Sequence, residues 1–389
     1  MTKEIPIIQI KEGKESSLRR FHPWVFSGAI AGVTEMPQNG EWVKVVDSKR
    51  KFLGAGHYQE GSISVRILTF QDVESDRLFW VNKLQIAWDM RMQYQLMGPD
   101  TNMFRWVHGE GDGLPGLILD VYDQVVVVQP HTIGMEQNAD SIAAAIEVVF
   151  PEVKSIYLKP SEKQLNSAPR YLKGGRVEVE CKEHGIRYAV DWETGQKTGF
   201  FIDQRENRKL LGALAKGKKV LNTFCYSGGF SLTALQGGAR HVDSLDSSAS
   251  ALELTLQNIA LNQVDATRHQ VIKADAVEYL KTVASDYDII VLDPPAFAKH
   301  LSAKHKAVQG YRKINEAAIR KIQPGGLIFT FSCSQAIDKD TFKGAVMAAA
   351  IDARRPVRIL YQLHQPADHP ISLFHAEGEY LKGLVIQVQ

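Results

Sequence analysis

Cysteine is scarce in this sequence, and long apolar segments are absent. The 389 residues include three cysteines, Cys181, Cys225 and Cys333, and none of them forms a CxxC pair. An odd number without that spacing argues against a disulfide framework and a structural zinc site, so no metal site is predicted. No apolar run approaches the roughly 18 residues of a membrane helix, and no basic-then-apolar leader opens the sequence. We therefore expect a cytoplasmic protein without a membrane partner.

An excess of charge of one sign is also missing. The 46 Lys and Arg residues exceed the 44 Asp and Glu residues by 46 minus 44, or +2, so net charge does not indicate a polyanionic partner. Any nucleic-acid site must then be a local patch. The phosphate loop GxxxxGK(S/T) does not occur. A chain of this length is too long to fold around a single hydrophobic core of ordinary size. We therefore expect two or three domains.

The stretch from Lys219 to Asp246 reads as a strand, a glycine turn, a helix and a second strand that ends in an acid. Ser227, Gly228 and Gly229 let the backbone turn tightly, and Asp246 follows about 20 residues later, where an acid accepts both hydroxyls of a ribose. The turn lacks the full GxGxxG that brings a pyrophosphate to a helix N-terminus. S-adenosylmethionine, a nucleoside cofactor without phosphate, fits this pattern better. A purely structural strand-turn-helix unit would show the same glycine pair.

Two more acids follow strands further along the chain. A strand segment from His269 ends at Asp275, where a carboxylate can read an adenine amino group. The buried-strand pattern YDIIVL, from Tyr287 to Leu292, runs directly into Asp293. Acids thus end three successive strands, which strengthens the prediction of a nucleoside site.

Six short segments are specific when they are taken together: HPWVFSGAI, HGEGDGLPGLILDVY, GQKTGFFIDQRENR, CYSGGFSL, DPPAFAK and SCS. With them the chain resembles the class I methyltransferases, and specifically the bacterial ribosomal RNA cytosine-5 methyltransferases that carry an N-terminal PUA domain. The resemblance covers nearly all of the chain. It implies an α/β protein with a C-terminal Rossmann-like methyltransferase domain (191–389), an N-terminal PUA-like β-barrel (1–70) and a small central α+β domain (71–190).

The first 70 residues contain short alternating segments between polar turns, which predicts a small β-barrel. Cations and aromatic residues are interleaved here, as suits a phosphate backbone and unstacked bases. The alternative is a core that includes Trp24 and Phe26 under a solvated basic rim, because both alternate with Val25. The resemblance to RNA-binding PUA domains favours RNA binding, with these predicted contacts: Arg19, Arg20, Trp24, Lys49, Arg50 and Lys51.

The central residues predict a small α+β unit. Residues 75–95 read as an amphipathic helix, residues 117–121 and 125–129 as a hairpin, residues 135–150 as a helix and residues 153–158 as a strand. Residues 109–116, GEGDGLPG, are interpreted as a structural turn because their acids lack the calcium-loop spacing. Residues 357–363 and 380–388 predict a closing antiparallel pair, and residues 364–379 a long loop over the site.

The segment from 195 to 208 precedes the first cofactor strand. Asp203, with Glu206 three residues on, fits a helix capping box. The resemblance implies instead that this segment covers the cofactor, and the two roles of Asp203 stay open. The predicted cofactor contacts come from this segment and from the strand ends. They are Lys197, Thr198, Phe200, Asp203, Arg205, Asn222, Phe224, Ser227, Gly228, Gly229, Asp246, Ser247, Asp275, Ala276, Asp293 and Pro294.

Cys333 follows an apolar strand, Gly326 to Phe331, at the edge where open α/β sheets bind ligands. Methylation of cytosine carbon 5 requires a nucleophile on carbon 6, and a thiolate suits that work. A lone cysteine is more often a small buried hydrophobe. The resemblance implies that Cys333 is the nucleophile and that Asp293 hydrogen-bonds the base. Many such enzymes have a second cysteine where this chain has Ala296, so the base that releases the adduct is not identified.

Two other functions are compatible with these residues. The Asp293-Pro294-Pro295-Ala296-Phe297 turn can bind an amino group while Phe297 stacks on a base, which would allow methylation of a purine nitrogen without a cysteine. A non-catalytic RNA-binding protein with a relic cofactor site is the second alternative. The expected partner is 23S ribosomal RNA, free or partly assembled. The target nucleotide and the choice between a monomer and a homodimer stay open.

Overall fold

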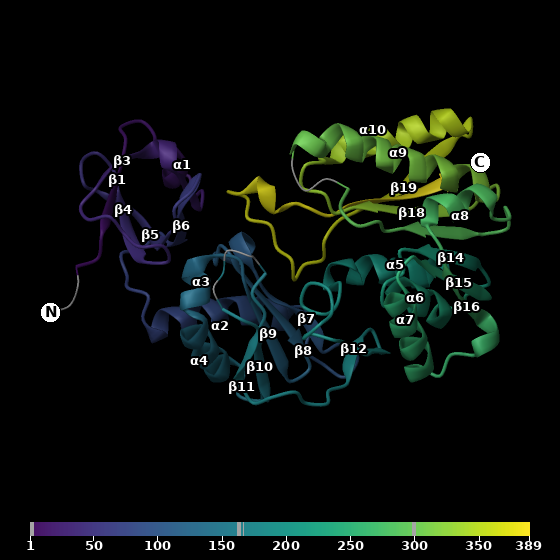
Figure 1. The fold of residues 1–389 in the computed structure, drawn as a ribbon, viewed down its shortest axis with the longest axis horizontal. Coiled ribbons are helices and arrows are strands. Elements are labelled where there is room, and N and C mark those ends of the chain that lie inside the picture. The colour runs from purple at the N-terminus through teal and green to yellow at the C-terminus, as the bar shows by residue number, and fades with distance from the viewer. Residues whose placement is uncertain (1–3, 162–164, 166, 298–300) are drawn as a thin grey trace. The chain divides into compact units, whose positions relative to one another are not determined.

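The computed structural model describes residues 4–161, 165, 167–297 and 301–389. Two residues of the quoted DPPAFAK segment, 298 and 299, lie outside this range. The chain forms two compact units (Figure 1). The first contains Met1–Cys181, Val190–Ile202 and Ala367–Gly378, and the second contains Lys182–Ala189, Asp203–Pro366 and Glu379–Gln389.

The N-terminal sheet of the first unit has six strands in the order β2-β6-β5-β4-β1-β3. In β1 alternate residues, Ile8 and Ile10, are buried, and they belong to a separate apolar core that also includes Val25, Val43 and Val65. The strands predicted for this region are confirmed. The bounds are β1 Ile7–Ile10, β2 Trp24–Phe26, β3 Ile30–Val33, β4 Trp42–Val46, β5 Phe52–Tyr58 and β6 Ile63–Thr69, with the short helix α1 Ser16–Arg19.

A second sheet in the same unit has five strands in the order β11-β10-β9-β8-β7. Helices α2 and α4 pack on it around a second core that includes Trp80, Trp106 and Ile146. The predicted hairpin is confirmed, since β8 and β9 pair antiparallel. The bounds are β7 Met103–His108, β8 Leu117–Tyr122, β9 Val125–Pro130, β10 Ser155–Leu158, β11 Arg170–Lys173, α2 Arg77–Gln93, α3 Ile133–Gln137 and α4 Ala139–Val149.

The single helix predicted over residues 135–150 is wrong in one respect, because the structure has two helices that meet at Asn138. The Asn138 side chain donates to the Gly134 carbonyl over 2.8 Å. Such a local bond from an asparagine competes with the regular helical pattern and is typical of a helix boundary. Asn138 therefore ends α3 and precedes α4.

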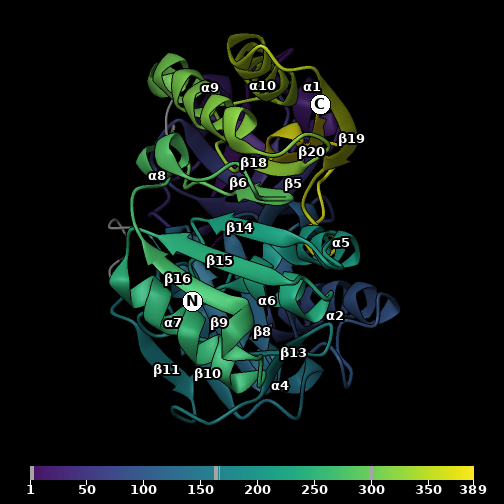
Figure 2. The same ribbon diagram turned by 90° about the vertical axis from the view of Figure 1, so that its right-hand side faces the viewer.

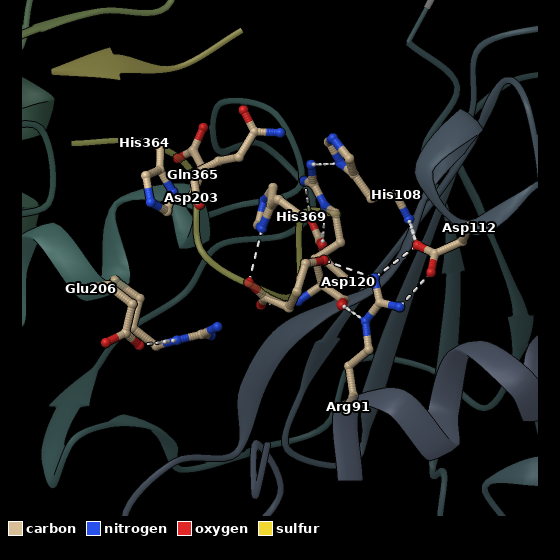
Figure 3. Close-up of polar contacts among 12 residues, drawn as sticks. Arg91, His108, Asp112, Asp120, Asp203, Glu206, His364, Gln365 and His369 are labelled. Carbon is tan, nitrogen blue, oxygen red and sulfur yellow. Dashed lines mark hydrogen bonds and ion pairs between the residues drawn. The ribbon is translucent and has the colours of Figure 1, made fainter. Parts of the chain in front are cut away.

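The GEGDG turn is held by a buried arginine. Arg91 of α2 donates to both carboxylate oxygens of Asp112, over 2.5 and 2.8 Å, and the His108 amide donates to the same carboxylate (Figure 3). Arg91 also donates to the Asp368 carbonyl over 2.7 Å. The segment 367–378, from the loop that the sequence predicts over the site, therefore packs with the first unit.

The second unit is a doubly wound α/β domain. Its seven strands have the order β16-β15-β14-β17-β18-β20-β19. Strand β20 pairs antiparallel with both of its neighbours, β18 and β19. Helices α5, α6 and α7 cover one face of the sheet, and α8, α9 and α10 cover the other (Figures 1 and 2). The predicted closing pair of strands, 357–363 with 380–388, is confirmed.

The bounds of this unit's elements follow the predicted alternation of strand and helix. The strands are β13 Ile186–Tyr188, which pairs with β12 Cys181–Glu183, and β14 Lys219–Thr223, β15 His241–Asp246, β16 His269–Lys273, β17 Ile289–Leu292, β18 Leu327–Ser332, β19 Val357–Leu363 and β20 Lys382–Val388. The helices are α5 Arg205–Leu214, α6 Gly229–Gln236, α7 Ala249–Leu261, α8 Ala276–Thr282, α9 Lys304–Lys321 and α10 Lys339–Ala353. In the described ranges, no helix is long and apolar enough to cross a membrane.

Candidate functional site

The carboxyl ends of five parallel strands meet at one edge of the second unit's sheet. β14 pairs with β15 and β17, β15 with β16, and β17 with β18, all in parallel. Asp246 ends β15, while Asp293 follows β17 and Cys333 follows β18. In open α/β sheets this edge is the ligand-binding edge. The fold therefore places the predicted catalytic and ribose-binding residues along one edge.

The glycine turn after β14 has a backbone that other residues adopt with difficulty. Gly228 has a φ of +75°, and a Cβ on it would lie 2.8 Å from Cγ2 of Thr255. The Thr255 hydroxyl donates to the Tyr226 carbonyl, and the Tyr226 amide donates to Asp246. Glycine is thus required both for the left-handed conformation and for the close approach of α7. The turn and the acid are fixed to each other.

Asp246, the predicted ribose ligand, is oriented by two backbone amides. Its Oδ2 accepts from the Tyr226 amide over 3.1 Å, and its Oδ1 accepts from the Ser248 amide over 2.9 Å. The side chain stays half-buried, and an ionised carboxylate has about four acceptor positions. Two backbone bonds orient it and leave capacity for a diol. The remaining acceptor positions of this carboxylate fit the ribose hydroxyls of S-adenosylmethionine. Ser247, which follows, is exposed.

Asp275 has a structural partner in addition to its predicted role. It is the N-cap of α8, where its Oδ1 accepts from the Glu278 amide over 3.0 Å. The side chain is exposed, and the neighbouring Ala276 is buried. The cap accounts for an aspartate at this position. Contact with adenine stays a prediction for both residues.

Asp293 is oriented by a side chain that the sequence analysis missed. The Gln204 side-chain amide donates to its Oδ1 over 3.1 Å, and the Asn207 side-chain amide donates to Oε1 of Gln204 over 2.7 Å. Gln204 and Asn207 are buried, whereas Asp293 is half-buried and Pro294 is buried. Gln204 lies within the GQKTGFFIDQRENR segment. Its place as a polar residue next to Asp203 is the sequence feature that could have indicated a role in the site. The amide chain holds the carboxylate at the strand end.

The predicted helix cap at Asp203 is wrong. Helix α5 begins at Arg205, its N-cap is Gln204, and Asp203 lies in a short 3-10 turn, Ile202–Gln204. Asp203 instead accepts a hydrogen bond from the Tyr380 hydroxyl over 2.8 Å. Both Asp203 and Arg205 are buried. Of the two roles left open for Asp203, the ligand-facing one stays a prediction.

Several predicted cofactor residues have partners inside the protein. Thr198 donates to Asp120 over 2.5 Å, and Lys197 lies 4.4 Å from the centre of the Phe201 ring. These two residues and the buried Phe200 belong to the first unit. In the second unit, Asn222 donates to the Ser231 hydroxyl over 2.9 Å, and Phe224 packs against the core. Ser227 and Gly229 are buried in the turn and the start of α6.

The three cysteines have different surroundings. Cys181 and Cys225 are 1% and 5% exposed, and burial raises the pKa of each thiol to about 12. Cys333 is half-buried at the end of β18. Because the thiolate is the reactive form, burial disfavours the first two as nucleophiles at neutral pH. Cys333 is the cysteine that the fold leaves accessible at the ligand edge.

Phe297 packs against the protein and is only partly exposed. Its ring centre lies 4.7 Å from that of Tyr311 in α9, and a Cβ on Gly310 would lie 3.0 Å from its ring. The Tyr311 hydroxyl in turn shares a hydrogen bond with the Ser334 hydroxyl over 2.9 Å. Stacking of Phe297 on a base stays a prediction. Its observed contacts support the end of the Asp293-to-Phe297 turn.

The predicted RNA-contacting cations gather at the turn between β4 and β5. Asp47 accepts from the amides of Lys49 and Lys51, and also from the Arg19 guanidinium over 2.7 Å. Lys49, Arg50 and Lys51 are all exposed, and Arg50 adopts a left-handed φ of 61°. We call residues 49–51 the basic turn. Arg20, also exposed, donates to the Ser16 carbonyl.

The interpretation of Trp24 and Phe26 as core residues is wrong. Val25 is 2% exposed and lies in the core, so its two neighbours point to the other face of β2. Phe26 is 47% exposed, and Trp24 is half-buried with its Nε1 donating to Glu110 over 2.9 Å. The Trp24 ring also packs edge-on against His375, 4.3 Å away. An aromatic face therefore lies outside the apolar core.

Comparison with known proteins identifies two domain families in the chain and relatives that match nearly all of it. A family model described as S-adenosylmethionine-dependent methyltransferase matches residues 143–371, and a PUA-like domain model matches residues 8–70. The ribosomal RNA large subunit methyltransferase I of Alteromonas mediterranea is 39% identical over 396 residues, covering 97% of this chain and 98% of the relative. The protein with the same name from Escherichia coli strain K12 is 36% identical over 391 residues, covering 97% and 98%.

A solved structure has the same fold. An S-adenosylmethionine-dependent methyltransferase from Streptococcus mutans superposes with a TM-score of 0.84, covering 99% of this chain and 100% of that one, at 23% identity. The family model spans more than half of the chain, and the relatives above 30% identity span nearly all of it. The chain therefore belongs to the S-adenosylmethionine-dependent methyltransferase family, with an N-terminal PUA-like domain and S-adenosylmethionine as its cofactor.

Proposed function

We propose that this enzyme methylates carbon 5 of a cytosine in large-subunit ribosomal RNA through a covalent bond to Cys333. The relatives that match over their full length are named ribosomal RNA large subunit methyltransferases. The observation that carries the choice of chemistry is the accessibility of the cysteines. Cys333 is half-buried at the ligand edge, whereas burial raises the pKa of Cys181 and Cys225 to about 12.

The residues of the site have distinct tasks in this reaction. The Cys333 thiolate adds to carbon 6 of cytosine, which makes carbon 5 electron-rich. S-adenosylmethionine supplies an electrophilic methyl group. Asp293, oriented by Gln204, forms a hydrogen bond with the base and stabilises the adduct as charge develops on the ring. A base then removes the proton from carbon 5, and the electrons of that bond expel the thiolate from carbon 6.

The cofactor is held mainly by the second unit. The glycine turn at Gly228 lies under the amino-acid part of the cofactor, Asp246 binds the ribose, and Asp275 lies near the adenine. Asp203, Arg205, Asn222, Phe224, Ser227, Gly229, Ser247, Ala276 and Pro294, with Lys197, Thr198 and Phe200 of the first unit, complete the proposed set. The two bonded oxygens of Asp246 support its assignment, because they fix the carboxylate without filling its acceptor positions.

RNA is held by the PUA-like domain. The basic turn offers exposed cations to phosphates, and Trp24 with its exposed neighbour Phe26 offers aromatic faces to unpaired bases. The substrate is 23S ribosomal RNA, free or partly assembled, encountered in the cytoplasm. Separate hydrophobic cores among the described N-terminal, central and C-terminal residues support a division into three domains, at about residues 70 and 190. Sedimentation would decide between a monomer and a homodimer.

The covalent step is tested with RNA that carries 5-fluorocytosine at the target position. Fluorine cannot leave carbon 5 as a proton does, so the wild-type enzyme is expected to stay attached to the RNA after methyl transfer. Cys333→Ala is expected to form no such complex, to lose turnover, and to keep its affinity for the cofactor. Cys225→Ala serves as the matched control and is expected to form the complex.

Methylation of a purine nitrogen is the competing outcome. In that reaction Asp293 and Phe297 would recognise the base without a nucleophile. A Cys333→Ala enzyme that still methylates ribosomal RNA would exclude the covalent mechanism and favour this alternative. Mass spectrometry of nucleosides from the methylated RNA distinguishes the two products directly.

A further inference from the structure

A buried lysine lies beside the predicted nucleophile. Lys382 is the first residue of β20, and it pairs with Ser332, the last residue of β18. Cys333 follows Ser332 directly. Lys382 is 4% exposed, which is rare for a lysine unless it has compensating partners. In the sequence, Lys382 stands out as a cation near the start of the mostly apolar segment LKGLVIQV.

The Lys382 ammonium is held by two backbone carbonyls. Its Nζ donates to the Ser334 carbonyl over 2.7 Å and to the Tyr380 carbonyl over 2.7 Å. These bonds fix the nitrogen next to the chain that carries Cys333. Carbonyl groups are dipoles and carry no net charge, so these bonds do not by themselves balance a buried cation. The compensating charge must come from nearby acids.

The carboxylates around Lys382 are engaged with other cations. Asp338 accepts from Lys304 over 3.0 Å and caps α10, and Glu379 pairs with Lys339 over 2.5 Å. Burial lowers the pKa of Lys382 to about 8; Cys333, followed by Glu379 and Asp338, opposes that change, while Lys339 adds to it. The thiol of Cys333 is therefore the acid whose ionisation interacts most strongly with Lys382.

We propose that Lys382 is a positioning residue for the reaction, and that its ammonium stabilises the Cys333 thiolate both before it adds to carbon 6 and when it leaves the adduct. This inference rests on the proposed nucleophilic role of Cys333. The thiol proton passes to solvent, and Lys382 keeps its own proton throughout. When the adduct collapses, the electrons of the carbon–sulfur bond return to the sulfur beside the same cation. Lys382 thus acts through Cys333 and has no direct contact with the base.

A purely structural role would require only the two bonds to carbonyls. The two roles differ in how Cys333 reacts with an alkylating reagent, because an adjacent positive charge favours the thiolate and a neutral side chain does not. The experiment follows the rate of iodoacetamide labelling of Cys333 in the full-length enzyme between pH 6 and 9.5, resolved by peptide mass spectrometry. No RNA or cofactor is required.

Lys382→Met removes the charge and keeps an unbranched side chain that is one atom shorter. We expect Cys333 in this variant to react roughly tenfold more slowly at pH 7, with its labelling profile displaced to higher pH. Lys382→Arg keeps the charge and is expected to restore most of the labelling rate. Lys219→Met is the matched control. Lys219 lies at the amino end of β14, away from the carboxyl ends of the parallel strands, and it pairs with Asp286.

The same experiment can overturn the inference. If folded Lys382→Met labels at Cys333 with the wild-type pH profile, Lys382 is structural. Near-ultraviolet circular dichroism and cofactor affinity report whether the variant is folded. If it is not, Lys382→Gln is the uncharged comparison, since a glutamine amide can still donate to a carbonyl, and labelling of that variant at the wild-type rate has the same meaning.

Failure of this inference is distinct from failure of the proposed function. Trapping by 5-fluorocytosine in RNA reports whether Cys333 is the nucleophile, whatever the role of Lys382. A trapped complex together with an unchanged labelling profile removes only the role of Lys382. Absence of trapping, with turnover retained in Cys333→Ala, removes the nucleophile itself.

Discussion

Arg208 of α5 donates two hydrogen bonds to Glu183 of β12, over 2.7 and 2.6 Å, and both side chains are almost completely buried. The pair joins the first helix of the methyltransferase unit to the hairpin that precedes it. Its position matters for the site, because a Cβ on Gly229 would lie 3.0 Å from Cδ of Arg208. A buried ion pair therefore supports the helix that begins at the glycine turn.

Removal of one partner of this pair should destabilise the second unit strongly. Glu183→Leu deprives the buried Arg208 guanidinium of the carboxylate that it pairs with, and breaking a buried pair in this way costs about 3 to 5 kcal/mol. The double variant Glu183→Leu, Arg208→Met removes both charges and is expected to recover most of that loss. Urea unfolding of the three proteins measures both effects. A double variant no more stable than Glu183→Leu would contradict the assigned role of the pair.

Asp246→Ala should weaken S-adenosylmethionine binding at least about tenfold. The carboxylate is expected to accept charge-assisted hydrogen bonds from the ribose, each worth about 1.5 to 3 kcal/mol. Calorimetry on the purified protein measures the affinity. Asp286→Ala, which removes an exposed acid paired with Lys219, is the control and should bind as the wild type does. Unchanged affinity in Asp246→Ala would refute the ribose assignment.

Replacing Lys49, Arg50 and Lys51 with glutamine should weaken binding to ribosomal RNA and reduce its dependence on salt. Each phosphate contact to single-stranded RNA that is lost lowers the slope of log affinity against log salt by about 0.7. Filter binding at several salt concentrations gives the slope. A triple variant that removes exposed lysines elsewhere, Lys209, Lys313 and Lys343, tests whether any three cations have this effect. Equal slopes for both triple variants would argue against a site at the basic turn.

Acid should destabilise the first unit through His57. This residue of β5 is 4% exposed, and burial lowers its pKa from 6.5 to about 4. Between pH 6.5 and 4 the unfolded chain binds more protons than the folded one, so stability falls as pH falls through that window. The loss should reach about 2 kcal/mol by pH 5.

His57→Gln provides the comparison for the acid effect, because glutamine does not titrate. Subtracting its unfolding free energy from that of the wild type at each pH isolates the contribution of His57. This difference should be constant above about pH 7.5, and below that pH the wild type should lose stability relative to His57→Gln. A difference that does not vary between pH 7.5 and 5 would show that His57 is not buried in its neutral form.

Local pattern was sufficient for much of the fold. Buried runs such as Ile289–Leu292, the glycine turn at Gly228 and the acids that end successive strands are all readable from residues near one another in sequence. Period-two alternation also predicted the N-terminal strands, although it could not assign the faces of β2 correctly. Alternation shows that a short strand has two faces, but it does not show which of the two faces is buried.

What the sequence by itself determined is the set of strand-end residues, Asp246, Asp293 and Cys333, since a parallel sheet brings the carboxyl ends of its strands to one edge. Only the tertiary structure decided which groups orient them. Gln204 reaches Asp293 across 89 positions, and the Lys382 ammonium reaches the Ser334 carbonyl across 48. These partners depend on how α5 and β20 pack beside the sheet. Long-range packing has no local periodicity, so no pattern in the sequence near either residue records it.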